Sequence, residues 1–198
     1  MIIWINGAFG SGKTQTAHEL HRRIPDSFIY DPENAGYFIQ RNLPAEMKLS
    51  DFQDYPMWRE FNYSMLRNIS KQYTGHIIVP MTIVNPQYFA EIVGRLRSDG
   101  VVVHHFALCA DRKVLIRRLR SRAEGANSWA AQQIDRCIEG LSNPIFEFRL
   151  DTNLLSTDDV VTRIASMLDI PLQPDHRGGL RKKYDRWITQ LKYIRFFS

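Results

Sequence analysis

Short apolar runs alternate along the chain with longer segments in which hydrophobic residues recur every three or four positions. Such runs are typical of buried strands, and the periodic segments are typical of amphipathic helices. The runs predict strands near residues 1–6, 27–31, 76–81, 101–108 and 147–151. The periodic segments predict helices near residues 13–24, 34–42, 56–72, 86–98, 111–122, 128–141 and 157–168. Because strands and helices alternate, the pattern predicts an α/β fold with a parallel sheet covered on both faces.

The first predicted strand and helix enclose the motif GAFGSGKT, residues 7–14. Its spacing is that of a phosphate-binding loop, in which glycines let backbone N–H groups turn toward an anion. Lys13 is expected to reach the outer phosphates of ATP, and the Thr14 hydroxyl is expected to bind Mg²⁺. The fold expected is therefore a three-layer P-loop domain. Its nucleotide contacts would come from Gly7, Ala8, Phe9, Gly10, Ser11, Gly12, Lys13 and Thr14.

Two carboxylates follow the second predicted strand, in the stretch FIYDPENAG. Asp31 at this strand end would serve as a general base or as a ligand of Mg²⁺, and Glu33 is a weaker candidate. The alternative is that Asp-Pro only begins a turn. The third predicted strand reads GHIIVPMTIV, with Pro80 where many P-loop proteins carry an acid that helps to hold Mg²⁺. Either Asp31 supplies the missing carboxylate, or hydrolytic power is weak.

Four arginines lie within six residues in the stretch DRKVLIRRLRSRAEGANSW. Arginine forks match phosphate oxygens, and a mobile lid would bring them over a transferring phosphoryl group. Arg118 and Arg122 share one helix face and are the pair expected to contact phosphate. Arg117 and Arg120 are expected to be solvated. The alternative for the whole group is a solvated helix face.

The chain of 198 residues has an ordinary globular composition, with 44% hydrophobic and 24% charged residues. Its two cysteines, Cys109 and Cys137, have no metal-binding spacing and indicate reduced thiols in a cytoplasmic protein. The net charge of +5 is confined to residues 173–198, which hold seven basic and two acidic residues. The rest of the chain is neutral, which argues against a nucleic-acid partner.

Several longer stretches resemble the tunicamycin-resistance protein family, a branch of the P-loop small-molecule and nucleoside-monophosphate kinases. They are MIIWINGAFGSGKTQTA, IYDPE, DFQDYPMWREFNYS, IIVPMTIVNPQYF, RAEGANSWAAQQIDRC and the basic C-terminal segment. The resemblance covers nearly the whole chain. It implies an ATP-binding protein that protects a bacterium from tunicamycin, a nucleoside antibiotic that carries uracil, sugars and a fatty acyl chain. It leaves open whether the drug is phosphorylated or held.

Five aromatic residues and Arg59 fall within LSDFQDYPMWREFNYSML, the region that covers the second substrate in the kinase branch. Stacking of Trp58 or Tyr55 on a uracil ring, and contact of Arg59 with substrate, are the functional hypotheses. Trp58, Phe61 and Met65 have helical spacing, which favours a core role for most of the group.

The C-terminal segment predicts one more helix with an apolar stripe: Leu180, Tyr184, Trp187, Ile188, Leu191 and Ile194. Basic residues flank the stripe, a pattern suited to an anionic membrane surface. The alternative is a helix that docks on the domain. The expected division is residues 1–172 as the nucleotide-binding domain and residues 173–198 as a peripheral membrane tail. A chain that ends at Asp175 should then remain folded.

Two functions compete on this sequence. In one, the protein transfers the terminal phosphate of ATP to a hydroxyl of the drug, with Asp31 as base and Arg118 and Arg122 as a clamp. In the other, nucleotide only switches a protein that sequesters the drug. The strand-end carboxylate and the arginines favour transfer, and Pro80 favours sequestration.

Overall fold

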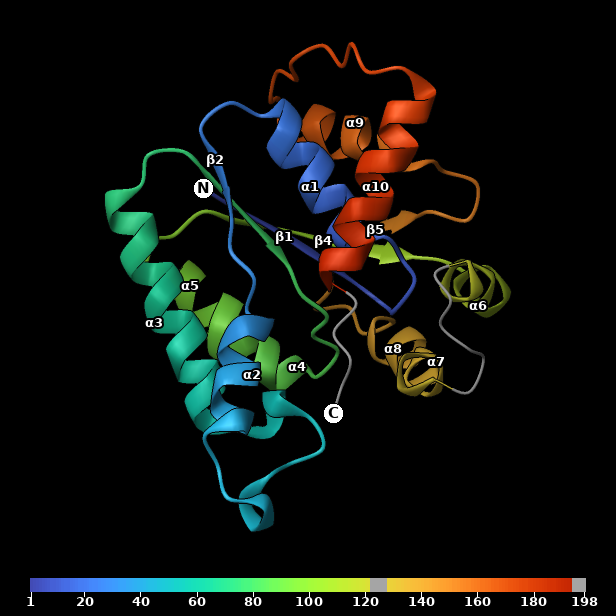
Figure 1. Cartoon of the computed structure of the whole chain (residues 1–198). Coiled ribbons are helices and arrows are strands. Elements are labelled where there is room, and N and C mark those ends of the chain that lie inside the picture. The colour runs from blue at the N-terminus through green and yellow to red at the C-terminus, as the bar shows by residue number, and fades with distance from the viewer. Residues whose placement is uncertain (122–127, 194–198) are drawn as a thin grey trace.

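The computed structural model of the chain describes residues 1–121 and 128–193, with side chains as far as Gln190. Its centre is a five-stranded sheet in the order β2-β3-β1-β4-β5 (Figure 1). Every neighbouring pair of strands is parallel. The strands are β1 (Ile2–Gly7), β2 (Ser27–Ile29), β3 (His76–Pro80), β4 (Val103–Cys109) and β5 (Phe148–Asp151). The predicted α/β fold is confirmed.

Helices connect successive strands and lie on both faces of the sheet (Figure 1). They are α1 (Lys13–Arg23), α2 (Glu33–Arg41), α3 (Pro56–Gln72), α4 (Pro86–Phe89), α5 (Arg95–Ser98), α6 (Arg112–Arg120), α7 (Trp129–Gln132), α8 (Ile134–Gly140), α9 (Thr157–Met167) and α10 (Gly179–Tyr193). A π-helical turn, Ala90–Gly94, joins α4 to α5. Short 3-10 turns at Ala45–Met47 and Phe52–Asp54 precede α3. The helix expected over residues 128–141 is divided into α7 and α8 at Gln133.

The side chains of β1 divide the hydrophobic core into two parts. Ile2 and Trp4 pack with α3, α5 and the π-helical turn on one face of the sheet, whereas Ile3 and Ile5 pack with α1 and α9 on the other. This division follows from the alternation of side chains along a strand. All four side chains are fully buried. Because helices cover both faces, the carboxyl edge of the sheet is where a ligand can meet the strands.

The C-terminal segment lies against the body of the protein. In Figure 1, α10 runs alongside α1, and the Gln15 amide on α1 donates a hydrogen bond to the Arg186 carbonyl, 2.8 Å away. The N–H of Gln173 donates to the Arg23 carbonyl at 2.8 Å, and Arg23 Nε donates back at 3.0 Å. The junction near residue 172, where a domain boundary was expected, is therefore held to α1.

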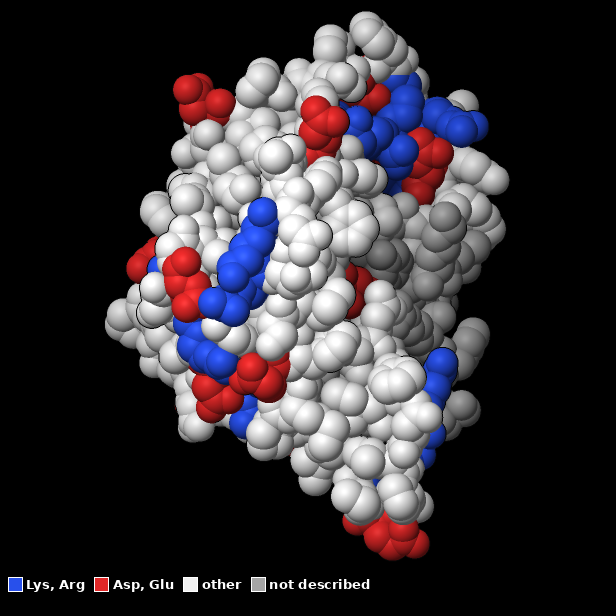
Figure 2. All heavy atoms as spheres, turned by 90° about the vertical axis from the view of Figure 1, so that its left-hand side faces the viewer, with Lys and Arg blue, Asp and Glu red and all other residues white. Residues whose placement is uncertain are grey.

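Within the described part of the chain, no helix is both long and apolar enough to cross a membrane. The face in Figure 2 carries basic and acidic side chains in small mixed groups, with wide uncharged areas between them. That face offers no extended basic surface to a nucleic-acid backbone. The expectation that nucleic acid is not a partner stays a prediction.

Candidate functional site

The loop between β1 and α1 has the backbone of a phosphate cradle. Gly7, Gly10 and Gly12 have φ angles of 149°, 82° and 101°, a region that glycine enters at little cost. A side chain at Gly7 would meet the Ser11 hydroxyl at 2.5 Å, and one at Gly10 would meet the Leu115 carbonyl at 2.9 Å. Gly7 and Gly10 are therefore required both by conformation and by space, and Gly12 is required by conformation alone.

Lys13 lies across this loop at the start of α1. Its ammonium donates to the carbonyl of Gly7 at 2.9 Å and to that of Ala8 at 3.2 Å, so the cation sits over the curve of the loop. No described side chain caps the N-terminus of α1, which leaves its first N–H groups directed at the loop. Thr14 is half-buried in the first helical turn. This combination of cation, helix end and hydroxyl suits a polyphosphate with its Mg²⁺.

A buried polar cluster that the sequence analysis missed fixes the start of the loop. Asn6 Oδ1 accepts the N–H of Gly7 at 2.8 Å and that of Ile83 at 3.0 Å, and Asn6 Nδ2 donates to the Ile83 carbonyl at 2.7 Å. Thr82 Oγ1 donates to the Gly7 carbonyl at 2.8 Å. Asn6 Nδ2 also contacts His105 Nε2 at 3.1 Å. A polar Asn within an apolar strand, just before the glycines, is the signal that could have found this cluster.

The environment of His105 keeps its imidazole neutral. The side chain is fully buried and lies edge-on to Phe89, with ring centroids 4.9 Å apart. Burial, with a smaller contribution from the charge of Arg97, lowers the pKa of His105 to about 3. His105 is thus a structural residue behind the loop.

Pro80 ends β3 beside Ile5 of β1, as the sequence suggested. The first carboxylate along the chain after this strand is Glu91, and it pairs with Arg59 at 2.5 Å. The usual position of an Mg²⁺-binding acid is therefore apolar. Among the predicted ligands, only Asp31 can offer a carboxylate from a strand end.

Asp31 lies half-buried between β2 and α2. Its Oδ1 accepts a hydrogen bond from the N–H of Glu33 at 3.0 Å. This bond is the one expected if the Asp-Pro pair begins a turn. The neighbouring Tyr30 hydroxyl donates to Asn62 Oδ1 at 2.8 Å, and burial together with the Asp31 charge raises the pKa of Tyr30. Glu33 begins α2 and accepts from the Tyr37 hydroxyl at 3.4 Å. Asp31 therefore has a turn role and also follows β2 at the carboxyl edge of the sheet.

Arg118 points from α6 toward the end of β5. Its Nη2 donates to the Thr152 carbonyl, and its Nη1 lies 3.3 Å from Thr152 Oγ1. Burial, and then repulsion from Arg117, lower the pKa of Arg118. Arg117 and Arg120 are exposed, as expected. Arg122, the predicted partner of Arg118, lies outside the described residues.

A cavity of about 320 Å³ lies between the phosphate loop, Arg118 and the connection from β5 to α9. Its lining combines the loop glycines with the hydroxyls of Thr152 and Ser156 and the apolar side chains of Leu155 and Val160. Arg186 and Gln190 of α10 complete the lining. Such a mixture suits the sugar and base of a nucleotide whose phosphates lie in the loop.

The predicted acceptor residues are closed to ligands in this arrangement. The Trp58 side chain has no exposed surface, and its indole N–H donates to the Pro32 carbonyl at 3.0 Å. The Tyr55 hydroxyl is bonded to both the N–H of Leu49 and the carbonyl of Met47. Stacking of either ring on uracil is therefore corrected to a packing role, because both rings are enclosed by α2 and the segment before α3.

Arg59 is also occupied inside the protein. Its guanidinium pairs with Glu91, donates to the Gln53 carbonyl and lies 4.2 Å from the centre of the Tyr88 ring. Only 7% of the residue is exposed. The predicted contact of Arg59 with substrate has no support in this arrangement, and its charge instead fastens α3 to the π-helical turn.

Comparison with known proteins agrees with this site. A family model described as an AAA domain matches residues 2–144. The tunicamycin resistance protein of Deinococcus radiodurans is 34% identical, with 88% of this chain and 98% of that chain covered and a TM-score of 0.76. The chain belongs to the tunicamycin resistance protein family. Within that family, its kinase-like P-loop fold and its phosphate loop mark it as a nucleotide-binding protein.

More distant structures share the fold alone. A sugar kinase from Janibacter is 19% identical, with 85% of this chain and 94% of that chain covered and a TM-score of 0.61. The APS kinase of Mycobacterium tuberculosis, solved with AMPPNP and APS, is also 19% identical, with 85% and 96% covered and a TM-score of 0.60. Comparison with curated protein sequences finds no match.

Proposed function

We propose that the chain is a phosphotransferase that inactivates tunicamycin by moving the terminal phosphate of ATP to one of its hydroxyls. The observation that carries this proposal is the pairing, at one edge of the sheet, of a phosphate cradle held by Lys13 with a half-buried carboxylate at Asp31. Parallel strands bring their carboxyl ends to the same edge, so a drug hydroxyl near Asp31 can approach the outer phosphate. The drug is assigned as the substrate because the chain belongs to the tunicamycin resistance protein family.

The proposed step is an in-line displacement. The hydroxyl oxygen of the drug forms a bond to the γ-phosphorus while the bond from that phosphorus to the β–γ bridging oxygen breaks. The hydroxyl proton passes to the Asp31 carboxylate, and ADP leaves with the bonding electron pair. Lys13 and Arg118 stabilise the negative charge that spreads over the phosphoryl oxygens. Arg122 is proposed to join them from the lid.

Mg²⁺ would be held by the Thr14 hydroxyl and the phosphates, with Asp31 as the proposed strand-end carboxylate. When bound, the ion would neutralise charge between the β- and γ-phosphates. The donor set in this chain is poorer than usual because Pro80 replaces an acid. Oxygen ligands are nevertheless available from Thr14 and Asp31, so the site fits a cation that keeps several waters.

The small number of protein ligands for Mg²⁺ also favours a second candidate function, which is nucleotide-dependent sequestration of the drug without chemistry. Both functions require ATP to bind, and they differ only in what happens to the drug. Incubation of the purified chain with tunicamycin and MgATP, followed by mass spectrometry, separates them. Phosphotransfer predicts a drug that has gained one phosphoryl group. Unchanged drug that remains bound to the protein would support sequestration.

We also propose that α10 rests on an anionic membrane surface. Leu180, Tyr184 and Trp187 are exposed on this helix, at 86%, 53% and 54% of their surface. Arg181 and Lys183 lie exposed beside them. Aromatic and aliphatic side chains flanked by cations are typical of helices that lie in a membrane interface. Tunicamycin carries a lipid chain, so a protein at that surface would meet the drug where it partitions.

A further inference from the structure

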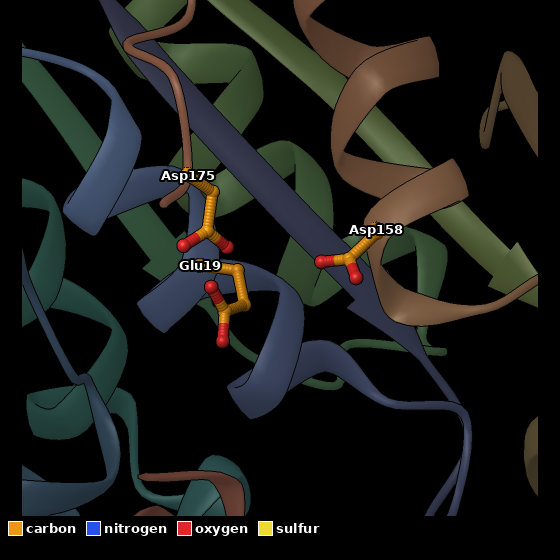
Figure 3. Close-up of side chains that lie close together, drawn as sticks. All are labelled: Glu19, Asp158 and Asp175. Atoms are coloured by element: carbon orange, nitrogen blue, oxygen red, sulfur yellow. The ribbon is translucent and has the colours of Figure 1, made fainter. Parts of the chain in front are cut away.

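Three carboxylates on the body and the C-terminal segment form a compact group. Glu19 lies on α1, Asp158 on α9 and Asp175 in the connection before α10, and one oxygen of each lies within 4.8 Å of the others. Figure 3 shows Glu19 and Asp175 next to each other, with Asp158 opposite them. Glu19 is only 2% exposed. Charges this close and this buried repel unless cations lie between them.

The cations come from the C-terminal segment. Arg177 donates to Glu19 and, at 2.8 Å, to Asp175. Lys182 lies 3.0 Å from Asp175 and 3.3 Å from Asp158. The pKa of Asp175 is far below its usual range, chiefly because Arg177 donates to its carboxylate. Glu19 and Asp158 on the body thus hold the C-terminal segment through these cations, and Asp175 of that segment completes the group.

Arg186 joins this receptor to the nucleotide cavity. Its Nη2 donates to Asp158 at 2.9 Å, and its Nε lies 3.7 Å from Glu19. Its carbonyl accepts from Gln15, two residues beyond Lys13 on the helix that follows the phosphate loop. Arg186 and Gln190, one helical turn apart, also line the cavity described above. One face of α10 is therefore both docked on α1 and directed at the nucleotide site.

We propose that α10 is a wall of the nucleotide site, that Gln190 contacts the nucleoside end of bound ATP, and that tail docking and ATP binding stabilise each other. This inference rests on ATP binding at the phosphate loop, as in the proposed function. The nucleoside end is assigned because Arg186 of α10 pairs with Asp158, which is close in sequence to Leu155 and Val160. Both of these apolar residues line the same cavity and suit a base better than phosphates. Mutual stabilisation follows because a ligand held by both parts favours the docked arrangement.

The proposal predicts a loss of affinity that depends on the nucleoside. Gln190→Ala in the full chain should weaken ATP binding about fivefold to tenfold, as expected for one lost polar contact, while inorganic tripolyphosphate binds as before. Arg186→Gln should weaken ATP binding at least as much, because it also loosens docking. Lys183→Gln, an exposed position on the same helix, should bind ATP within twofold of wild type.

Isothermal titration of these variants, with hydrogen exchange of residues 179–193 in the wild type, provides the test. ATP should slow exchange in this segment about tenfold, and tripolyphosphate should slow it less. Wild-type ATP affinity in both Gln190→Ala and Arg186→Gln would overturn the proposal, as would equal loss of ATP and tripolyphosphate binding. Failure of the wild type to bind ATP would instead refute the proposed function.

Discussion

Lys13 is the residue on which nucleotide binding depends most. Its ammonium lies over the loop through bonds to the Gly7 and Ala8 carbonyls, where it would meet the outer phosphates. Lys13→Ala should weaken ATP binding about tenfold to a hundredfold, the loss expected when a charge-assisted contact is removed. The fold should survive, because the Gly7 and Ala8 carbonyls that accept from Lys13 belong to the same loop.

Titration with ATP measures this effect, and circular dichroism checks the fold. Lys113→Ala, at an exposed position on α6, is the matched control and should bind like wild type. A folded Lys13→Ala protein with undiminished affinity would mean that the loop does not hold the nucleotide.

His105 should make stability depend on pH. Its pKa is lowered to about 3 by burial, below the ordinary value of 6.5, so the unfolded chain binds a proton that the folded chain refuses. Between these values, stability therefore falls as pH falls, by up to about 1.4 kcal/mol per pH unit from this residue. His105→Gln should flatten the dependence.

Urea unfolding at pH 4.5, 5.5 and 6.5 gives the slope. His104→Gln on the same strand is the control: its imidazole is only half-buried, so its loss should flatten the slope less. An identical slope for wild type and His105→Gln would show that His105 does not cause the dependence.

Among the helices, strands and loops, the sequence patterns predicted the features that depend on local or periodic signals. Alternating runs located all five strands, and the glycine spacing located the phosphate loop. The pattern could not tell which aromatic of the region before and within α3 faces a ligand, and Trp58 proved to be enclosed. Nor could it pair Arg177 with Glu19, because these residues are 158 positions apart in the sequence.

The docking of α10 changes the expectation for truncation. The sequence predicts that a chain ending at Asp175 stays folded, but this chain would lose the ion pairs of Arg177 and Arg186 with Glu19, which is 2% exposed in the full chain. Breaking a buried ion pair from one side typically costs about 3–5 kcal/mol, so the truncated chain should be less stable by an amount of this order. Adding Glu19→Gln to the truncated chain should restore much of the loss. Urea unfolding measures the difference in stability between the two chains. A truncated chain as stable as the full chain would show that these ion pairs do not stabilise the fold.

At the scale of the whole molecule, the surface charge of the tail is smaller than its composition suggests. Arg177, Lys182 and Arg186 pair with carboxylates, whereas Lys183 and the apolar residues Leu180 and Trp187 remain outward. Membrane binding should therefore depend on the apolar residues as well as on charge. The full chain should sediment with vesicles that contain anionic lipid and be partly released by high salt.

Replacing Leu180 and Trp187 by Ser should abolish sedimentation while ATP binding is kept, because both side chains point away from the body. Replacing exposed Phe28 on β2 by Ser is the control for loss of an apolar side chain elsewhere. If the chain with both substitutions still sediments with the vesicles, the membrane contact lies on another surface.

We propose that the terminal phosphate of ATP reaches the drug through a site that includes Asp31. The most direct measurement uses ATP labelled at the γ-phosphate and follows the label into tunicamycin, for the wild type and for Asp31→Asn. Phosphotransfer predicts labelled drug with the wild type. With Asp31→Asn, it predicts a loss of at least about a hundredfold in rate, the range expected when a general base is removed. ATP affinity should change little. Label that never enters the drug would contradict phosphotransfer, and label that enters equally fast in Asp31→Asn would contradict the role of Asp31 as base.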